Sequence, residues 1–210
     1  MAAPVTYYSP EDFFGRRIAI DDLDANTLRS DLLSAQAFIP LDITALREIA
    51  TNAIQNLTAH GGILGADSTP ILQRVNAATD KALRVHWAAS DSNEVTFPPV
   101  PWPPDLDEAE DVIVHLMLSR AGTTDGCIVD VQAIENGAGV YAADTEMGGN
   151  TSALTGAANT VIEATRTLSA SDIAGPPGFL NISLVPAAHT TDALYLFAAW
   201  IEYTRLLRTS

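Results

Sequence analysis

Three stretches of this chain alternate apolar and polar residues with a period of two, and this pattern constrains the fold more than any other feature. Successive side chains of a strand point to opposite faces of a sheet, so this period is typical of strands with one face in a core. The positions expected to face the core are Leu83, Val85, Trp87 and Ala89 in residues 81–89, Val112, Val114, Leu116 and Leu118 in residues 111–119, and Cys127, Val129, Val131 and Ala133 in residues 127–135. We therefore expect a chain built mainly from half-buried strands.

Shorter apolar stretches add further candidate strands, at residues 39–43, 71–76, 94–97, 160–168 and 179–185. Gly and Pro, which favour turns and loops, gather between the candidates at residues 60–65, 97–104, 137–149 and 175–178. Three strands are preceded by a Thr-Asp turn, at residues 79–80, 124–125 and 191–192. This arrangement predicts a mainly β fold, an antiparallel β-sandwich or jelly roll of about eight or nine strands.

The last candidate strand, residues 193–205, is apolar on both faces. A strand of this kind belongs in the centre of a sheet or across a subunit interface. The residues of this strand that we expect to contact another subunit are Tyr195, Phe197, Ile201 and Tyr203.

Residues 44–58 have a different period. Their apolar side chains recur with the spacing of one helix face, at Leu46, Ile49, Ala50, Ala53, Ile54 and Leu57. Thr44 is a candidate N-cap, and Gly61 lies near the expected end. The pattern predicts one short α-helix.

Residues 1–36 follow neither period and are interpreted as an N-terminal arm. Its aromatic and arginine side chains, which we expect to contact neighbouring subunits, are Tyr7, Tyr8, Phe13, Phe14, Arg16 and Arg17. Such a segment cannot bury a face of its own, so the arm is expected to be extended, with a short helix across residues 24–36. Residues 37–210 are then left as one β-sandwich domain.

The charge of the chain excludes some classes of partner. Asp and Glu number 26 against 11 Lys and Arg, which gives a formal net charge of −15. Nucleic acids and anionic membranes are therefore not expected as partners, because both are bound through basic side chains. No leader-like N-terminus and no apolar run of roughly 20 residues is present, which predicts a protein made in the cytoplasm.

No residue pattern points to catalysis, a cofactor or a metal ion. The acidic residues of 105–111 lack the central Gly and final Glu of a calcium loop, so a solvated loop is expected. The histidines, at positions 60, 86, 115 and 189, lack metal-ligand spacing and are interpreted as two solvent-facing strand residues and two loop residues. The chain also has no Gly-x-Ser-x-Gly nucleophile motif, and its single cysteine, Cys127, is expected to be a small core residue.

The proline-rich stretch 97–104 must be extended, because proline restricts its own backbone and that of the residue before it. It is interpreted as a strap across the sandwich with Trp102 as an anchor, and a polyproline ligand is the alternative. Trp102, Trp87 or Tyr141 would form a sugar-stacking platform if exposed, although its strand period places Trp87 inward.

Six segments together resemble a group of virion structural proteins of tailed bacteriophages. They are FIPLDIT at 38–44, NAATDKALRVHWAA at 76–89, PWPPDLD at 101–107, DTEMGG at 144–149, PGFLNISLVP at 177–186, and residues 189–204. The resemblance covers about residues 38–204 and does not reach the arm. It implies a β-sandwich capsid decoration or cement protein that forms a trimer, and it carries over no catalytic residue.

These observations lead to the expectation of a non-enzymatic homotrimer that cements the outer surface of a phage head, with the major capsid protein as its partner. The acidic charge suits that location, since packaged DNA would repel an acidic subunit on the inner wall. The alternative is a tail or adhesion component that binds host carbohydrate through exposed aromatic residues. A polysaccharide hydrolase, which would need two carboxyl groups across a groove, is a third class.

Overall fold

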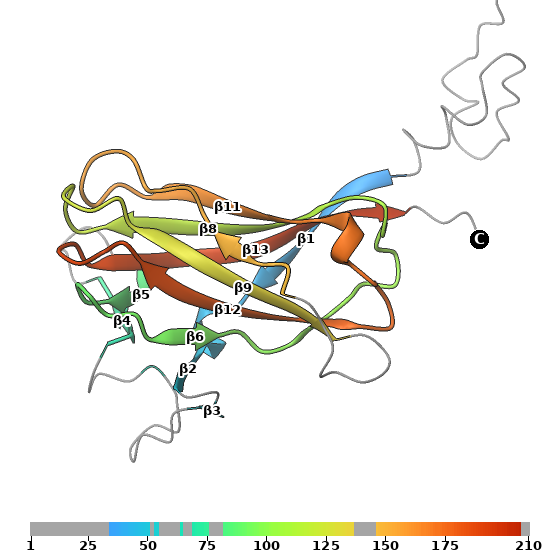
Figure 1. Cartoon of the computed structure of the whole chain (residues 1–210), viewed down its shortest axis with the longest axis horizontal. Coiled ribbons are helices and arrows are strands. Elements are labelled where there is room, and N and C mark those ends of the chain that lie inside the picture. The colour runs from blue at the N-terminus through green and yellow to red at the C-terminus, as the bar shows by residue number, and fades with distance from the viewer. Residues whose placement is uncertain are drawn as a thin grey trace, which may run out of the picture.

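The chain folds into two antiparallel sheets that pack face to face (Figure 1). The computed structural model describes residues 34–50, 53–54, 64, 69–75, 82–136 and 146–206. The mainly β sandwich predicted from the sequence is confirmed, with thirteen strands in the described residues. The strands beyond the expected eight or nine include three of only two residues, namely β3 (Ala53–Ile54), β7 (Val100–Pro101) and β10 (Gly149–Asn150).

The first sheet, called sheet A here, has six strands. Its order is β11 (Ile162–Leu168), β8 (Val112–Arg120), β13 (Leu194–Leu206), β5 (Leu83–Trp87) and β4 (Ile71–Arg74), with β1 (Ser34–Leu41) also paired to β13. Because β13 has 13 residues, it pairs along one edge with both β5 and β1. Its other edge pairs with β8, so β13 lies in the centre of sheet A.

The second sheet, sheet B, has seven strands. Its order is β10, β9 (Ile128–Asn136), β12 (Phe179–Ala187), β6 (Glu94–Thr96), β2 (Arg47–Ala50) and β3, with β7 also paired to β12.

In the described part of the chain, no helix is long and apolar enough to cross a membrane.

The core lies between the two sheets and is filled by alternate side chains of the long strands. Residues of 1% exposure or less include Val85, Trp87, Val112, Val114, Leu116, Leu118, Cys127, Val129, Val131, Ala133, Leu180, Ile182 and Leu184. Burial of these side chains is the main stabilising contribution to the sandwich. Leu83 and Ala89 were also expected to face the core but are exposed, because β13 pairs only with the residues of β5 from Val85 to Trp87.

The helix predicted over residues 44–58 is wrong in the described part of that range. One turn of 3-10 helix, η2 (Ile43–Ala45), precedes β2 and β3. Within β2, Glu48 lies opposite Val95 of β6 and is buried. Pairing with β6 and burial of alternate side chains, Leu46 and Glu48, override the helical spacing that the sequence carries.

A β-bulge in β13 separates residues that were expected to lie together at a subunit interface. Leu196 faces the core, and the register with β8 shifts between Leu196 and Ala198, so that Ile201 also faces the core. Because Phe197 is an extra residue, the side chains that face the core are even-numbered before it and odd-numbered after it. Ile201 is fully buried and Tyr203 is 8% exposed, so both side chains pack inside their own subunit rather than beside Tyr195 and Phe197.

The N-terminal arm falls almost entirely outside the described residues. Its last three residues, 34–36, are the start of β1 and pair with residues 204–206 of β13, so they are strand rather than part of the expected short helix. The other arm residues that were expected to contact neighbours lie outside the described residues, namely Tyr7, Tyr8, Phe13, Phe14, Arg16 and Arg17.

The proline-rich stretch runs alongside β12 in sheet B, rather than across the sandwich as a strap, and it is anchored by Trp102. Its indole is 5% exposed and donates a hydrogen bond of 2.6 Å to Oε1 of Glu135, a buried residue of β9. The same carboxylate accepts the backbone N–H groups of Ala174 and Gly175 at 2.6 and 2.8 Å. Trp102 and the buried Trp87 therefore cannot form the sugar-stacking platform considered above, and Tyr141 lies outside the described residues.

Candidate binding face

The outward-facing side chains of sheet A differ in kind from those of sheet B. On sheet B, among the described residues, they are a mixture of polar side chains, such as Thr96, Asp130, Gln132, Asn181 and Ser183, and apolar ones, such as Ile128, Ile134, Phe179 and Val185. On sheet A they include aromatic rings and carboxylates, and we define the outer face of sheet A by Phe38, His86, Ile113, His115, Met117, Glu163, Tyr195, Trp200 and Glu202. This face is the candidate site.

Trp200 lies near the middle of the outer face of sheet A. The register places it between His115 of β8 and Pro40 of β1. The Trp200 and His115 rings are stacked, with centroids 4.8 Å apart and an angle of 8° between their planes. In the next row, Phe38 lies opposite Glu202 and is 58% exposed, which makes it the most exposed large apolar side chain that the structure describes. Two aromatic side chains and a carboxylate thus occupy adjacent positions.

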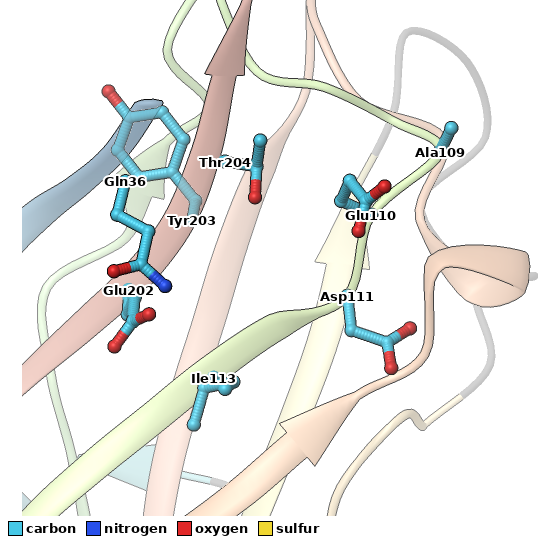
Figure 2. Close-up of a pocket in the computed structure, with 8 residues that line it drawn as sticks. All are labelled: Gln36, Ala109, Glu110, Asp111, Ile113, Glu202, Tyr203 and Thr204. Carbon is cyan, nitrogen blue, oxygen red and sulfur yellow. The ribbon is translucent and has the colours of Figure 1, made fainter. Parts of the chain in front are cut away.

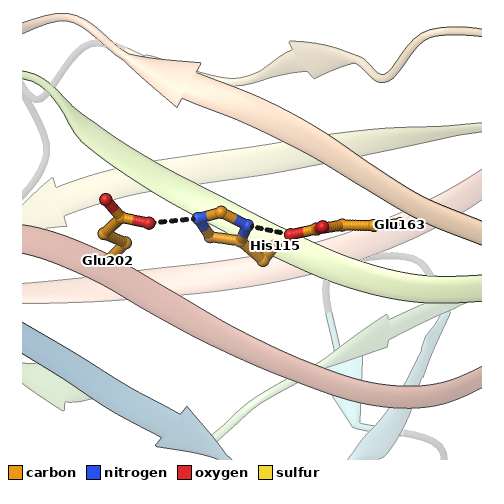
Figure 3. A network of polar contacts seen from close by, with 3 residues as sticks. All are labelled: His115, Glu163 and Glu202. Carbon is orange, nitrogen blue, oxygen red and sulfur yellow. Dashed lines mark hydrogen bonds and ion pairs between the residues drawn. The ribbon is translucent and has the colours of Figure 1, made fainter.

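His115 lies between two carboxylates from different strands (Figure 3). Its Nδ1 is 2.6 Å from Oε1 of Glu163 on β11, and its Nε2 is 3.0 Å from Oε2 of Glu202 on β13. The first contact is a hydrogen bond, whereas the second is a close charge contact without hydrogen-bond alignment. Because these neighbours surround it, His115 is only 9% exposed although it points away from the core.

A second cluster is centred on Tyr195. The guanidinium of Arg84 lies 3.7 Å from the centroid of the Tyr195 ring, and the His86 ring lies 5.2 Å from it. The Gln73 carbonyl, oriented to suit its neighbours, accepts from His86 Nδ1 at 3.0 Å and from Arg84. Burial, together with the charge of Arg84, lowers the pKa of His86. This cluster contains the positive charge of Arg84, whereas the His115 cluster contains two carboxylates.

A pocket of about 400 Å³ opens where β13, β1 and the start of β8 meet (Figure 2). Its lining residues are Gln36, Ala109, Glu110, Asp111, Ile113, Glu202, Tyr203 and Thr204. Glu202 belongs both to this pocket and to the His115 cluster, so the two are continuous. The lining offers three carboxylates, an amide and the hydroxyl groups of Tyr203 and Thr204, and it contains no basic side chain.

The chemistry available on this face is that of recognition. Aromatic rings accept flat apolar surfaces, and carboxylate and amide groups form hydrogen bonds with hydroxyl groups. Among the described residues, no three His, Cys, Asp or Glu side chains converge as metal ligands would. The one cysteine, Cys127, is fully buried, and burial raises the pKa of its thiol, which makes it a poor nucleophile.

Sequence reasoning missed the residues that define this face. Tyr195 was selected as an interface residue and lies on it, but Trp200, His115 and Glu202 were not selected. Their juxtaposition depends on which strands are neighbours and in what register. A period within one strand carries neither piece of information, and the signal that could have found them is coupling between positions on different strands.

Comparison with known proteins gives little beyond the fold. No family model matches the chain, and no curated protein matches it. Among solved structures, it is similar to a xylan-binding module, CBM15, with 10% identity, a TM-score of 0.42, and coverage of 80% of this chain and 97% of the module. It is also similar to the CBM22-1–GH10 modules of a Clostridium thermocellum endo-1,4-beta-D-xylanase complexed with xylohexaose, with 12% identity, a TM-score of 0.41, and coverage of 85% and 29%.

A third similar structure is TmCBM61 in complex with beta-1,4-galactotriose, with 12% identity, a TM-score of 0.36, and coverage of 81% of this chain and 88% of the module. Similarities this weak carry no argument about a ligand. The β-sandwich assignment rests on the strand order and register described above.

Proposed function

We propose that this protein is a non-catalytic binding domain that holds a neutral polysaccharide chain on the outer face of sheet A. The observation that carries the proposal is the adjacent placement of Trp200, Phe38 and Glu202 on that face. Sugar rings present apolar C–H faces that pack on aromatic side chains, and their hydroxyl edges donate to carboxylates. A solvent-facing sheet surface with both kinds of group in neighbouring rows suits an extended chain of such rings.

The charge of the face favours a neutral ligand over an anionic one. Glu163 and Glu202 flank His115, and Glu110 and Asp111 line the adjoining pocket. The whole chain carries a formal net charge of −15. Uronic acids and sulfated sugars would be repelled by this field, whereas neutral hydroxyl groups would find acceptors.

Affinity gel electrophoresis tests this proposal with soluble hydroxyethyl cellulose, arabinoxylan and galactan, and with polygalacturonate as the anionic comparison. At least one neutral polymer is expected to retard the protein, and polygalacturonate is not. Trp200→Ala should lose the retardation, because the stacking surface is removed. Phe179→Ala is the matched control, since Phe179 is a 38% exposed aromatic residue of sheet B. Retardation by no neutral polymer, or equal retardation of Trp200→Ala, would overturn the proposal.

A second candidate function follows from the sequence resemblance to phage virion proteins. In that proposal the chain is a homotrimeric cement protein on the outside of a head, and the outer face of sheet A is buried against another subunit or the major capsid protein. The observation that favours it is the exposed apolar surface of Phe38 and Leu206 along the β1–β13 pair. Sedimentation at micromolar concentration distinguishes the two candidate functions. A wild-type trimer that dissociates in the Phe38→Ser variant would support the cement role, and a wild-type monomer would contradict it.

A further inference from the structure

His115 is in contact with charged or aromatic groups from two neighbouring strands. Glu163 faces it from β11, and Glu202 and Trp200 face it from β13. Its neighbours on the same face of its own strand, Ile113 and Met117, do not titrate. On the side of Glu202, the adjoining pocket adds the carboxylates Glu110 and Asp111 and no basic side chain, so the charged groups that the structure shows against the imidazole are carboxylates. No ion pair between these glutamates and a basic side chain occurs in the part of the chain described.

The donor capacity of imidazole makes this arrangement dependent on protonation. A neutral imidazole donates from one ring nitrogen and presents a lone pair on the other, whereas the imidazolium donates from both. Carboxylate oxygens lie 2.6 Å from Nδ1 and 3.0 Å from Nε2 of His115. In the neutral form, one nitrogen lone pair must face a carboxylate oxygen at close range, which is repulsive. The observed positions give a charged ring attractive contacts on both sides, and the Nδ1 contact is the one aligned as a hydrogen bond.

The stacked indole connects this protonation to the proposed ligand site. A cation against the face of an indole is favourable, because the ring face is electron-rich. When the ring loses its proton, it loses this attraction and the charge attraction of the carboxylates, so the contacts that orient the ring against Trp200 become weaker. Histidine is the side chain whose charge ordinarily changes between roughly pH 5 and 8.

We infer that His115 is a positioning residue for Trp200 and that its protonation orders the aromatic platform, so that the outer face of sheet A binds its ligand more tightly in acid than at neutral pH. The part of this inference that concerns ligand affinity rests on the proposed function. The part that concerns the orientation of Trp200 does not need a ligand.

Tryptophan emission measured from pH 4.5 to 8.5 on the full chain tests the inference without a ligand. The wild type is expected to show one sigmoidal change in intensity, because the ring stacked on Trp200 changes charge. Trp200→Phe and His115→Gln should both lose this change. His86→Gln is the matched control, since His86 lies on the same face against Tyr195, and it should keep the change.

Two further variants distinguish positioning from a loss of folding. Glu163→Gln and Glu202→Gln keep the side-chain shape and remove one charge each, so the midpoint of the fluorescence change should move to lower pH by at least about 0.5 unit. A pH-dependent change that persists in His115→Gln, that is absent in the wild type, or whose midpoint does not move in either glutamine variant would overturn the inference.

The affinity readout uses the neutral polymer that retards the protein most in the gel assay. The dissociation constant at pH 5.5 is expected to be about fivefold lower than at pH 7.5, and His115→Gln should remove this ratio. Failure of every polymer to bind, with the fluorescence result intact, would defeat the proposed function and leave the positioning role standing. A wild-type ratio near one would defeat the link between protonation and affinity.

Discussion

Two aspartates hold the loops at one end of the sandwich by accepting each other's backbone N–H groups. The Asp192 carboxylate accepts from Thr124 N–H at 2.8 Å and from Asp125 N–H at 2.9 Å. In return, the Asp125 carboxylate accepts from Asp192 N–H at 2.8 Å and from Thr191 N–H. Each of the two Thr-Asp turns therefore accepts hydrogen bonds from backbone N–H groups of the other turn. Turn chemistry alone predicts only hydrogen bonds within each turn.

This reciprocal arrangement makes stability depend on pH with a defined sign. Backbone N–H groups of Thr191 and Asp192 hold the pKa of Asp125 below its ordinary value of 3.8. A carboxyl group with a lowered pKa in the folded state contributes stability above its ordinary pKa and loses it as pH falls through the folded value. Asp125→Asn should therefore lower the melting temperature by a few degrees at pH 7.

The difference in melting temperature between the wild type and Asp125→Asn should shrink steadily below pH 4. The wild-type carboxyl group becomes protonated there and loses the negative charge that the Asn variant lacks at every pH. Circular dichroism melts at pH 7, 5, 4 and 3 measure this difference. Asp130→Asn, on the outer face of sheet B, is the control for a general charge effect. A difference that stays constant with pH would contradict the role assigned to Asp125.

At the scale of elements, the period of two predicted the long strands well because their alternate residues fill the core. The period of two failed in β13, where the alternation of core-facing side chains shifts by one residue inside the strand. Without the bulge at Phe197, Leu194 and Leu196 would face one side of β13, while Ala199 and Ile201 would face the other. Periodicity cannot locate such an inserted residue, because both parities of this stretch are apolar.

Deletion of Phe197 tests this interpretation of β13. Once this inserted residue is removed, β13 is expected to pair with β8 as a regular strand in which Leu194, Leu196, Ala199 and Ile201 still face the core. The deletion variant is therefore expected to keep a cooperative thermal transition. Phe197→Ala keeps the residue count and the bulge, and it should lower the melting temperature by only a few degrees. A deletion variant without a cooperative transition would contradict the assignment of Phe197 as the extra residue.

One cause explains both the wrong helix prediction over residues 44–58 and the failure to predict the outer face of sheet A. In both cases a contact with a strand distant in sequence decides the outcome, as when β6 pairs with β2 or β8 with β13. Buried alternation on one strand is a local property and was predictable. The stacking of Trp200 on His115 and the contacts of His115 with Glu163 and Glu202 come from the order β11, β8, β13, which no local pattern encodes.

At the scale of the whole molecule, the two outer surfaces of the sandwich have different chemistry. Sheet B presents a mixture of polar and aliphatic side chains with Phe179 at one end, and sheet A presents several aromatic rings among carboxylates. The acidic excess of the sequence led to the expectation that nucleic acid and anionic membranes are not partners. Combined with the acidic pocket beside Trp200, it also restricts the class of polysaccharide that we expect the outer face of sheet A to bind.

The three tryptophans of the chain provide the most direct test of the central claim, that the outer face of sheet A binds a neutral polysaccharide through Trp200. Their indole N–H signals can be followed by NMR on 15N-labelled protein during titration with neutral hexasaccharides. The Trp200 signal is expected to shift with ligand concentration. The signals of Trp87 and Trp102 should stay in place, because their indoles donate to Asn93 and Glu135 inside the protein. No shift at millimolar hexasaccharide, or a shift that spares Trp200, would contradict the account.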